Sequence, residues 1–332
     1  MSAMLGKPQA ALEAMRLAEA SEVKVSLECY YWVLYAIRDV PHLSDFVMDL
    51  FGQLHPRGLT PDYLLFTMAF GFCALNADGD LAQALYSQHF IHTDINPTPE
   101  MVLFFCQACA QCSNPTVHML SSCDALMDRL EETGSVKDNM VEIYDQYLEL
   151  AATLGAVSSA FSRLKVLVNY GKEINTRMLN SLLLAASNAD KDSCSASLVT
   201  EVYDMFRFLG VPANEDTLKA LAFCTEKFDL SEAVGQWAQN MLEQLERQRS
   251  GEPLTEEERR AALIQEGHDE KVHVVVAPPH RVRQLQVAWN LRPRDTMLRR
   301  FGQNTKPKRE EAVGSMLGSV IPFGRSPGER RV

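Results

Sequence analysis

The feature that most constrains this chain is a recurrence of helix starts at a nearly constant spacing. Self-similarity at a period of 36 to 39 residues is typical of helical-hairpin repeats. A single hairpin cannot bury its own apolar face, whereas stacked neighbours can. We therefore expect an all-α protein in which residues 23–248 form a solenoid of about six repeats. Alternate helices are predicted to begin at Leu27, Tyr63, Met101, Met140, Met178 and Thr217.

Turn signals separate the predicted helices. A glycine ends each of several helices, where a left-handed residue is needed, and Pro, Thr, Asn or Asp opens the next helix. A second break, such as residues 76–80 or 187–190, divides each repeat into two helices. The glycines at these boundaries are Gly58, Gly134, Gly171 and Gly210.

Apolar side chains recur with the period of a helix, and no convincing period-two run occurs in residues 23–248. The stretch after Asp62 places Leu64, Met68, Phe72 and Leu75 on one face, together with Thr67 and Gly71. A later stretch follows the same rule with Leu198, Val202, Met205, Phe206 and Leu209.

The segments outside the repeats differ in character. Residues 1–22 are predicted to form an amino-terminal helical extension without the apolar centre of a signal peptide. Residues 249–278 form a linker with a short helix at 254–266 and a possible edge strand at 272–276. Residues 279–332 are rich in Arg, Gly and Pro and are predicted to be an extended tail that becomes ordered only against a partner.

Charge is divided unevenly along the chain. The whole sequence has a net charge of −11, but residues 279–332 carry 12 Lys or Arg against 4 acidic residues. The preceding 278 residues carry 20 basic and 39 acidic residues. An acidic body with a basic tail suggests that the tail binds nucleic acid or another anion.

Several short segments resemble pentatricopeptide repeats. Residues 202–212 look like the end of one repeat, residues 217–221 look like the opening of another, and Met48-Asp49-Leu50-Phe51 followed by Gly58, Pro61 and Asp62 repeats the pattern. The resemblance covers about two-thirds of the chain, although the repeats are one to four residues longer than is usual for the family. The tetratricopeptide repeat fits less well. The chain is most similar to divergent mitochondrial pentatricopeptide repeat proteins of trypanosomatid protists, many of which belong to the mitochondrial ribosome.

This resemblance implies one base-reading side chain near the start of each first helix. Leucine cannot hydrogen-bond a base edge, and glutamate repels phosphate, so we expect that the repeats do not read a single strand base by base. Only Asn180 has the small polar character that the family uses. The corresponding positions here are Cys29, Leu65, Leu103, Glu142, Asn180 and Lys219.

The tail supplies the candidate RNA-binding residues. Arginine forks bind phosphate through two parallel hydrogen bonds, and Trp289 and Phe301 lie between the cations, where they can anchor on protein or stack on a base. The candidate residues are Arg281, Arg283, Arg292, Arg294, Arg299, Arg300, Lys306, Lys308 and Arg309.

Other residue clusters give weaker signals. Cys106, Cys109 and Cys112 have a spacing seen in iron–sulfur sites, but on one helix their sulfurs fan apart, so we interpret them as buried thiols. His89 and His92 beside Asp94 lack a zinc-site pattern. No nucleotide-binding or nucleophile motif is present, and no apolar stretch is long enough to span a membrane. We therefore expect no enzyme activity, cofactor, metal, small-molecule substrate or membrane contact.

Two alternatives remain beside the leading hypothesis. The leading hypothesis is a non-catalytic structural component of a mitochondrial ribonucleoprotein, with the small subunit of the mitochondrial ribosome or its assembly intermediate as the first candidate. The solenoid would then hold neighbouring proteins, and the basic tail would contact rRNA. The first alternative is a stand-alone RNA-binding factor for mitochondrial transcripts. The second is a tetratricopeptide-like scaffold that binds no RNA.

Overall fold

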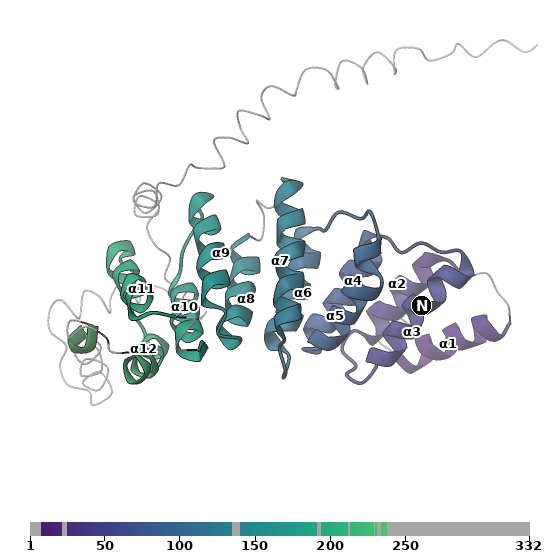
Figure 1. The fold of residues 1–332 in the computed structure, drawn as a ribbon. Helices are drawn as coiled ribbons and strands as arrows, with labels where there is room; N and C mark the ends of the chain where they lie inside the picture. Colours follow the sequence, from purple (N-terminus) through teal and green to yellow (C-terminus); the bar gives the residue numbers. More distant parts are fainter. Residues whose placement is uncertain are drawn as a thin grey trace, which may run out of the picture.

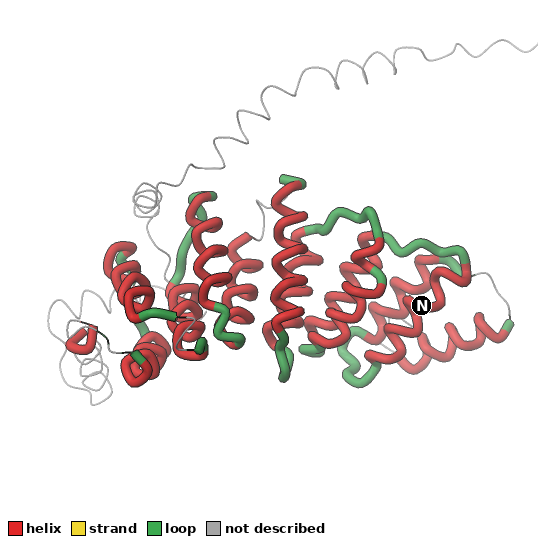
Figure 2. Tube along the Cα trace, viewed as in Figure 1, coloured by secondary structure: helices red, strands yellow, loops and turns green. Residues whose placement is uncertain are grey.

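The computed structural model describes residues 8–21, 25–134, 140–190, 194–211, 213–228, 230 and 234–237, which form an elongated stack of helices (Figure 1). Within these ranges no β-strand occurs (Figure 2). The helices are α1 (Pro8–Ala20), α2 (Leu27–Ile37), α3 (Ser44–Leu54), α4 (Tyr63–Leu75), α5 (Gly79–Gln88), α6 (Pro99–Gln111), α7 (Val117–Glu132), α8 (Met140–Thr153), α9 (Val157–Asn169), α10 (Thr176–Asn188), α11 (Ala196–Leu209) and α12 (Glu215–Lys227).

The helices are arranged in two rows. Helices α2, α4, α6, α8, α10 and α12 each pack against the next member of the same row, and we call this set the A row. Helices α3, α5, α7, α9 and α11 alternate with them along the chain and form the second row (Figure 1). Packing of each A-row helix against the next A-row helix is what a hairpin solenoid requires, so the predicted fold class is confirmed.

The predicted helix starts agree with the structure to within two residues. Helices α2, α4 and α8 begin at the expected residues, whereas α6, α10 and α12 begin two residues earlier. The earlier starts follow from capping, because Thr98, Asn175 and Asn214 each accept a hydrogen bond from the backbone N–H three residues on. Asp62 caps α4 in the same way.

The boundary glycines adopt the expected left-handed conformation. Gly58, Gly134, Gly171 and Gly210 have φ between 67° and 70°. A fifth glycine, Gly155, also has a positive φ (65°) in the turn between α8 and α9. A Cβ at Gly155 would lie 2.7 Å from the backbone nitrogen of Ala189, so this turn also needs glycine for the close approach of the next repeat.

Polar contacts hold the carboxyl ends of the A row in register. The Asn76 amide donates to the Arg38 carbonyl (2.9 Å) at the ends of α4 and α2. The Asn188 amide donates to the Ala152 carbonyl (2.9 Å) at the ends of α10 and α8. Lys227 donates to the Ser187 carbonyl (2.8 Å) at the ends of α12 and α10. These bonds satisfy carbonyls that a helix end leaves without an internal partner.

The apolar stripe predicted from the sequence is buried in one helix and only partly buried in another. In α11, Val202, Met205, Phe206 and Leu209 are buried, as expected. In α4, the predicted stripe is buried only in part, because Leu64 and Leu75 are 39% and 62% exposed whereas Phe72 is buried. Most of the buried side chains of α4 lie outside the predicted stripe, because α4 is apolar on nearly every side and periodicity cannot select one face. The buried residues of α4 are Leu65, Phe66, Ala69, Phe70, Phe72, Cys73 and Ala74.

The amino-terminal segment contains α1, which packs against α2 and buries Ala11 and Met15. The predicted linker helix at 254–266, the strand at 272–276 and the tail at 279–332 lie outside the described residues.

Candidate interaction surface

The six positions that would read bases do not form a uniform row. Leu65 and Asn180 are buried, Leu103 is half-buried, and Cys29, Glu142 and Lys219 are exposed. Lys219 already pairs with Glu215 at 3.5 Å and with Asp216 at 3.8 Å. The structure therefore brings these positions onto one row of helices without giving them a shared polar surface.

Asn180, the best sequence candidate for a base contact, bonds to the next repeat. Its amide donates to the Asn214 side-chain oxygen at 3.0 Å, and its side-chain oxygen accepts from the Thr217 hydroxyl at 2.6 Å. Asn180 is 6% exposed and Thr217 is fully buried. These bonds join α10 to the amino terminus of α12, so the Asn180 side chain stabilises the stack.

The A row offers few cations. Helices α2, α4, α6 and α8 contain no Lys or Arg, and α8 carries three acidic residues. Arg177 of α10 is paired with Glu149 of α8 at 2.5 Å. Because nucleic-acid affinity comes largely from cations that neutralise phosphates, this row is poorly suited to an RNA backbone.

An apolar groove opens between α2 and α4. Its volume is about 570 Å³, and α2 and α4 meet less extensively than the other neighbouring A-row helices. Trp32, Tyr35 and Leu64 remain 39%, 42% and 39% exposed. We call this hollow the α2–α4 groove, and its lining consists of Glu28, Tyr31, Trp32, Tyr35, Leu64 and Met68.

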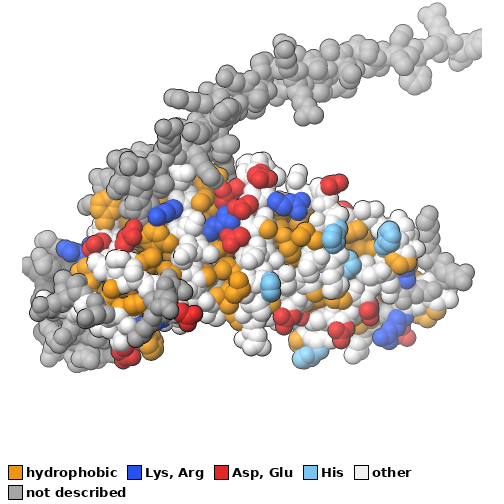
Figure 3. All heavy atoms as spheres, in the orientation of Figure 1, with side chains coloured by type: hydrophobic (Ala, Val, Ile, Leu, Met, Phe, Trp, Pro, Cys, Tyr) orange, Lys and Arg blue, Asp and Glu red, His pale blue; other side chains and the backbone are white. Residues whose placement is uncertain are grey.

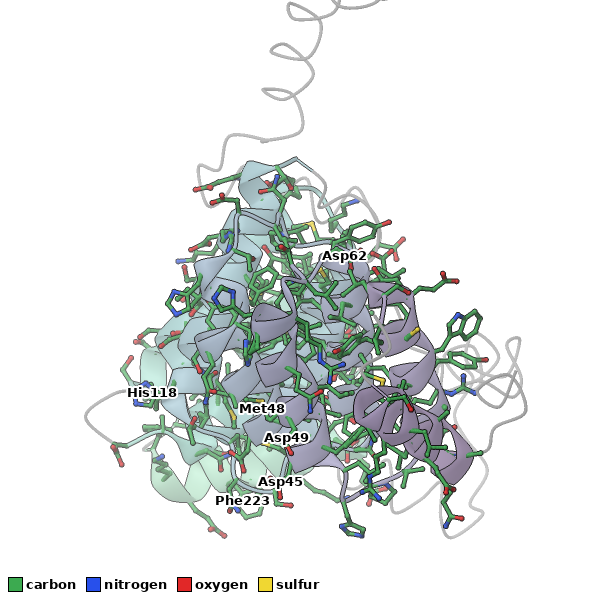
Figure 4. The ribbon with its side chains drawn as sticks, turned by 90° about the vertical axis from the view of Figure 1, so that its right-hand side faces the viewer. Asp45, Met48, Asp49, Asp62, His118 and Phe223 are labelled. Atoms are coloured by element: carbon green, nitrogen blue, oxygen red, sulfur yellow. The ribbon has the colours of Figure 1, made fainter. Side chains whose placement is uncertain are left out.

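Ring contacts and one hydrogen bond shape this groove. Trp32 meets Tyr35 edge to face, with ring centroids 6.1 Å apart, and the Arg38 guanidinium lies 4.2 Å from the centre of the Tyr35 ring. The Tyr31 hydroxyl donates to Asp62, the cap of α4, which Figure 4 labels. Burial and the neighbouring Asp62 carboxylate raise the pKa of Tyr31, so the phenol stays protonated.

A second hollow lies between α10 and α12. It has a volume of about 510 Å³ and includes the exposed side chains Leu184 and Phe223, the latter labelled in Figure 4. Its charged side chains are already matched, since Arg177 pairs with Glu149 and Lys219 with Asp216. This hollow therefore presents apolar surface with balanced charge.

The second row of helices carries an ion cluster centred on the buried Arg163 side chain. Arg163 of α9 bonds to Asp124 (2.7 Å) and Asp128 (2.8 Å) and reaches Glu131 at 3.3 Å, all three on α7. Glu131 also accepts a hydrogen bond from the Tyr144 hydroxyl of α8 at 2.8 Å. Acidic and basic side chains gather between α7 and α9 in Figure 3. The cluster ties three helices together across a repeat boundary.

The cysteines are free thiols, and most are buried, as the sequence indicated. Burial, with the Cys106 and Cys109 thiols next to it, raises the pKa of Cys123 well above its ordinary value. A thiol in this state is inert. Cys112 is half-buried and bonds to the Cys109 carbonyl.

One of the two histidines singled out from the sequence, His89, takes a structural position. His89 packs against the Phe51 ring, with centroids 5.4 Å apart, and its pKa is lowered by burial and by the nearby His92. Across the described ranges, no group of three or more His, Cys, Asp or Glu side chains is placed to hold a metal ion.

The candidate RNA-binding residues of the tail, Arg281 to Arg309, all lie outside the described residues. Conversely, the sequence reasoning did not single out the α2–α4 groove. A usable signal was present, because Glu28, Trp32 and Tyr35 recur at i, i+4 and i+7 on one face of α2.

Comparisons with known proteins identify no relative. No protein-family model matches the chain, and no curated protein matches it significantly. None of the helices in the described part of the chain is both long and apolar enough to cross a membrane.

Proposed function

We propose that this protein is a non-catalytic structural component of a mitochondrial ribonucleoprotein, with the mitochondrial ribosomal small subunit or its assembly intermediate as the leading candidate. The A row of the solenoid holds neighbouring proteins. Residues 279–332 contact rRNA through the cations from Arg281 to Arg309.

One observation supports the assignment of protein binding to the A row and of rRNA binding to the tail. The A row has no Lys or Arg on α2, α4, α6 or α8 but exposes an aromatic groove, whereas the tail carries 12 cations and 4 acids. Apolar grooves favour protein segments, and clustered arginines favour phosphate. The internal bonds of Asn180 support the same assignment, because they occupy the side chain best suited to read a base.

The mitochondrial location rests on the resemblance to pentatricopeptide repeat proteins of that compartment. Fractionation of cells that express the full chain tests it directly. Recovery outside mitochondria would favour the tetratricopeptide-like scaffold instead.

The tail assignment is tested by neutralising four of its arginines in the full chain: Arg281, Arg283, Arg292 and Arg294, each changed to Gln. A matched control changes four earlier basic residues in the same way: Arg247, Arg249, Arg259 and Arg260. Each lost phosphate contact lowers the slope of log affinity against log salt concentration by about 0.7 to 0.9. The tail variant should therefore leave the particle at moderate salt, while the control variant stays bound. Equal retention of both variants would contradict the proposal, and RNA binding unchanged by tail neutralisation would favour the stand-alone RNA-binding factor.

A further inference from the structure

We propose that the α2–α4 groove binds a protein segment in which one Arg or Lys lies one helical turn before a group of apolar side chains. The inference deepens the proposed function and rests on it, because it names the kind of partner that the solenoid holds.

The apolar part of the occupant follows from the floor of the groove. Leu64 and Met68 come from α4, and Trp32 and Tyr35 come from α2, so the two helices present one continuous apolar surface. Leu64 is not needed for the core, since other side chains of the same helix, such as Leu65 and Phe66, already fill it. Exposed apolar surface gathered in a hollow is typical of an interaction site.

The cationic part of the occupant follows from one end of the groove. Glu28 is the charged residue of the lining, and within the described residues no Lys or Arg pairs with it. Trp32 is four residues after Glu28, so the carboxylate and the indole share a face of α2. An ammonium or guanidinium placed there meets both a carboxylate and an aromatic ring.

At the other end of the groove, a cation of the chain itself already contacts both an aromatic ring and a carboxylate. The Arg38 guanidinium lies over the Tyr35 ring at 4.2 Å and pairs with Asp39 at 3.2 Å. The occupant's cation is therefore directed to the Glu28 end, away from Arg38. Ten residues of helix separate these ends, which corresponds to about 15 Å, so a helical segment of about ten residues spans the groove.

RNA is a poorer fit for this groove. A base can stack on Trp32, but the lining supplies no Lys or Arg for the adjoining phosphate and Glu28 repels it. The chain's own residues 281–301 combine cations with apolar side chains, so they are the competing occupant that the experiment must separate.

The test uses the full chain and two synthetic helical peptides of about 12 residues. One peptide has Arg one turn before a pair of leucines, and its twin has Glu in place of that Arg. By calorimetry, the Arg peptide should bind at least about tenfold more tightly than the Glu peptide, the factor that a cation–π contact with an ion pair supplies. Glu28→Lys should reverse this preference, and Glu142→Lys, the same charge change on α8, should leave it intact. Equal binding of the two peptides, or no binding, would overturn the proposal.

A photo-crosslinking phenylalanine derivative at position 64 of the full chain separates the two occupants. Cross-links to the Arg peptide are expected. Cross-links to residues 279–332 of the same chain would overturn the proposal and assign the groove to the tail. Peptide binding and cross-linking do not depend on RNA. The groove proposal can therefore fail while the tail arginine variants still leave the particle at lower salt, and the tail assignment can fail while the Arg peptide still binds the groove.

Discussion

Thr217→Val is the most informative single substitution in the solenoid. Thr217 is fully buried, and its hydroxyl donates to the Asn180 side-chain oxygen at 2.6 Å and accepts from the Asn214 backbone N–H at 3.0 Å. Valine has nearly the same shape, so the change removes hydrogen bonds without opening a cavity.

The expected loss of stability depends on which hydrogen-bonding groups Thr217→Val leaves without a partner. The Asn180 oxygen is buried and cannot turn to water, and leaving such a group unsatisfied costs about 1–3 kcal/mol. The Asn214 residue is exposed, so its N–H can bond to water at little cost. We therefore expect Thr217→Val to destabilise the contact between α10 and α12 by about 2 kcal/mol, within that range.

The assay pairs urea unfolding with hydrogen exchange of the α12 amides, because a solenoid can lose its end repeat before the rest unfolds. Thr225→Val is the matched control in the same helix, since the exposed Thr225 hydroxyl bonds to the Leu221 carbonyl one turn earlier. If Thr217→Val were no more harmful than Thr225→Val, the structural role given to Asn180 would be refuted.

Three further predictions concern the stack. Arg163→Met should lower the free energy of unfolding by about 3 kcal/mol, because it leaves buried carboxylate uncompensated, whereas the exposed pair of Arg177 should make Arg177→Met cost less than about 1 kcal/mol in the same urea titration. Gly79→Ala should cost about 1–3 kcal/mol in thermal unfolding, since its Cβ would lie 2.8 Å from a cysteine sulfur, whereas Gly52→Ala in open helix should stabilise by up to about 1 kcal/mol. Burial raises the pKa of Asp145 to about 6, so the folded state loses stability as the pH rises from about 4 through 6. Asp145→Asn should therefore stabilise the protein at pH 8 and have almost no effect at pH 4. Urea unfolding midpoints at the two pH values would show this difference.

The repeat architecture was predictable because the residues that start and end each helix act on their immediate sequence neighbours. Each cap, such as Asp62 or Asn214, and each left-handed glycine, such as Gly210, acts within a few residues of its own position. The repeat period then follows from the distance between these signals, and the predicted starts of the A-row helices agree with the observed starts to within two residues.

The interaction surface was less predictable because it depends on contacts between repeats. Periodicity correctly grouped Leu64 and Leu75, yet the buried face of α4 is decided by what α2 and α6 place against it. Likewise, Asn180 has the composition of a base reader, and only the approach of Thr217 from the next repeat shows that its side chain is occupied.

Mapping RNA contacts on the native full chain tests the central claim most directly. Ultraviolet cross-linking followed by mass spectrometry identifies each peptide that carries a covalently attached nucleotide. The account predicts nucleotides on peptides from residues 279–332 and none on α2, α4, α6, α8, α10 or α12. Nucleotides attached to the A row, with none on the tail, would contradict it.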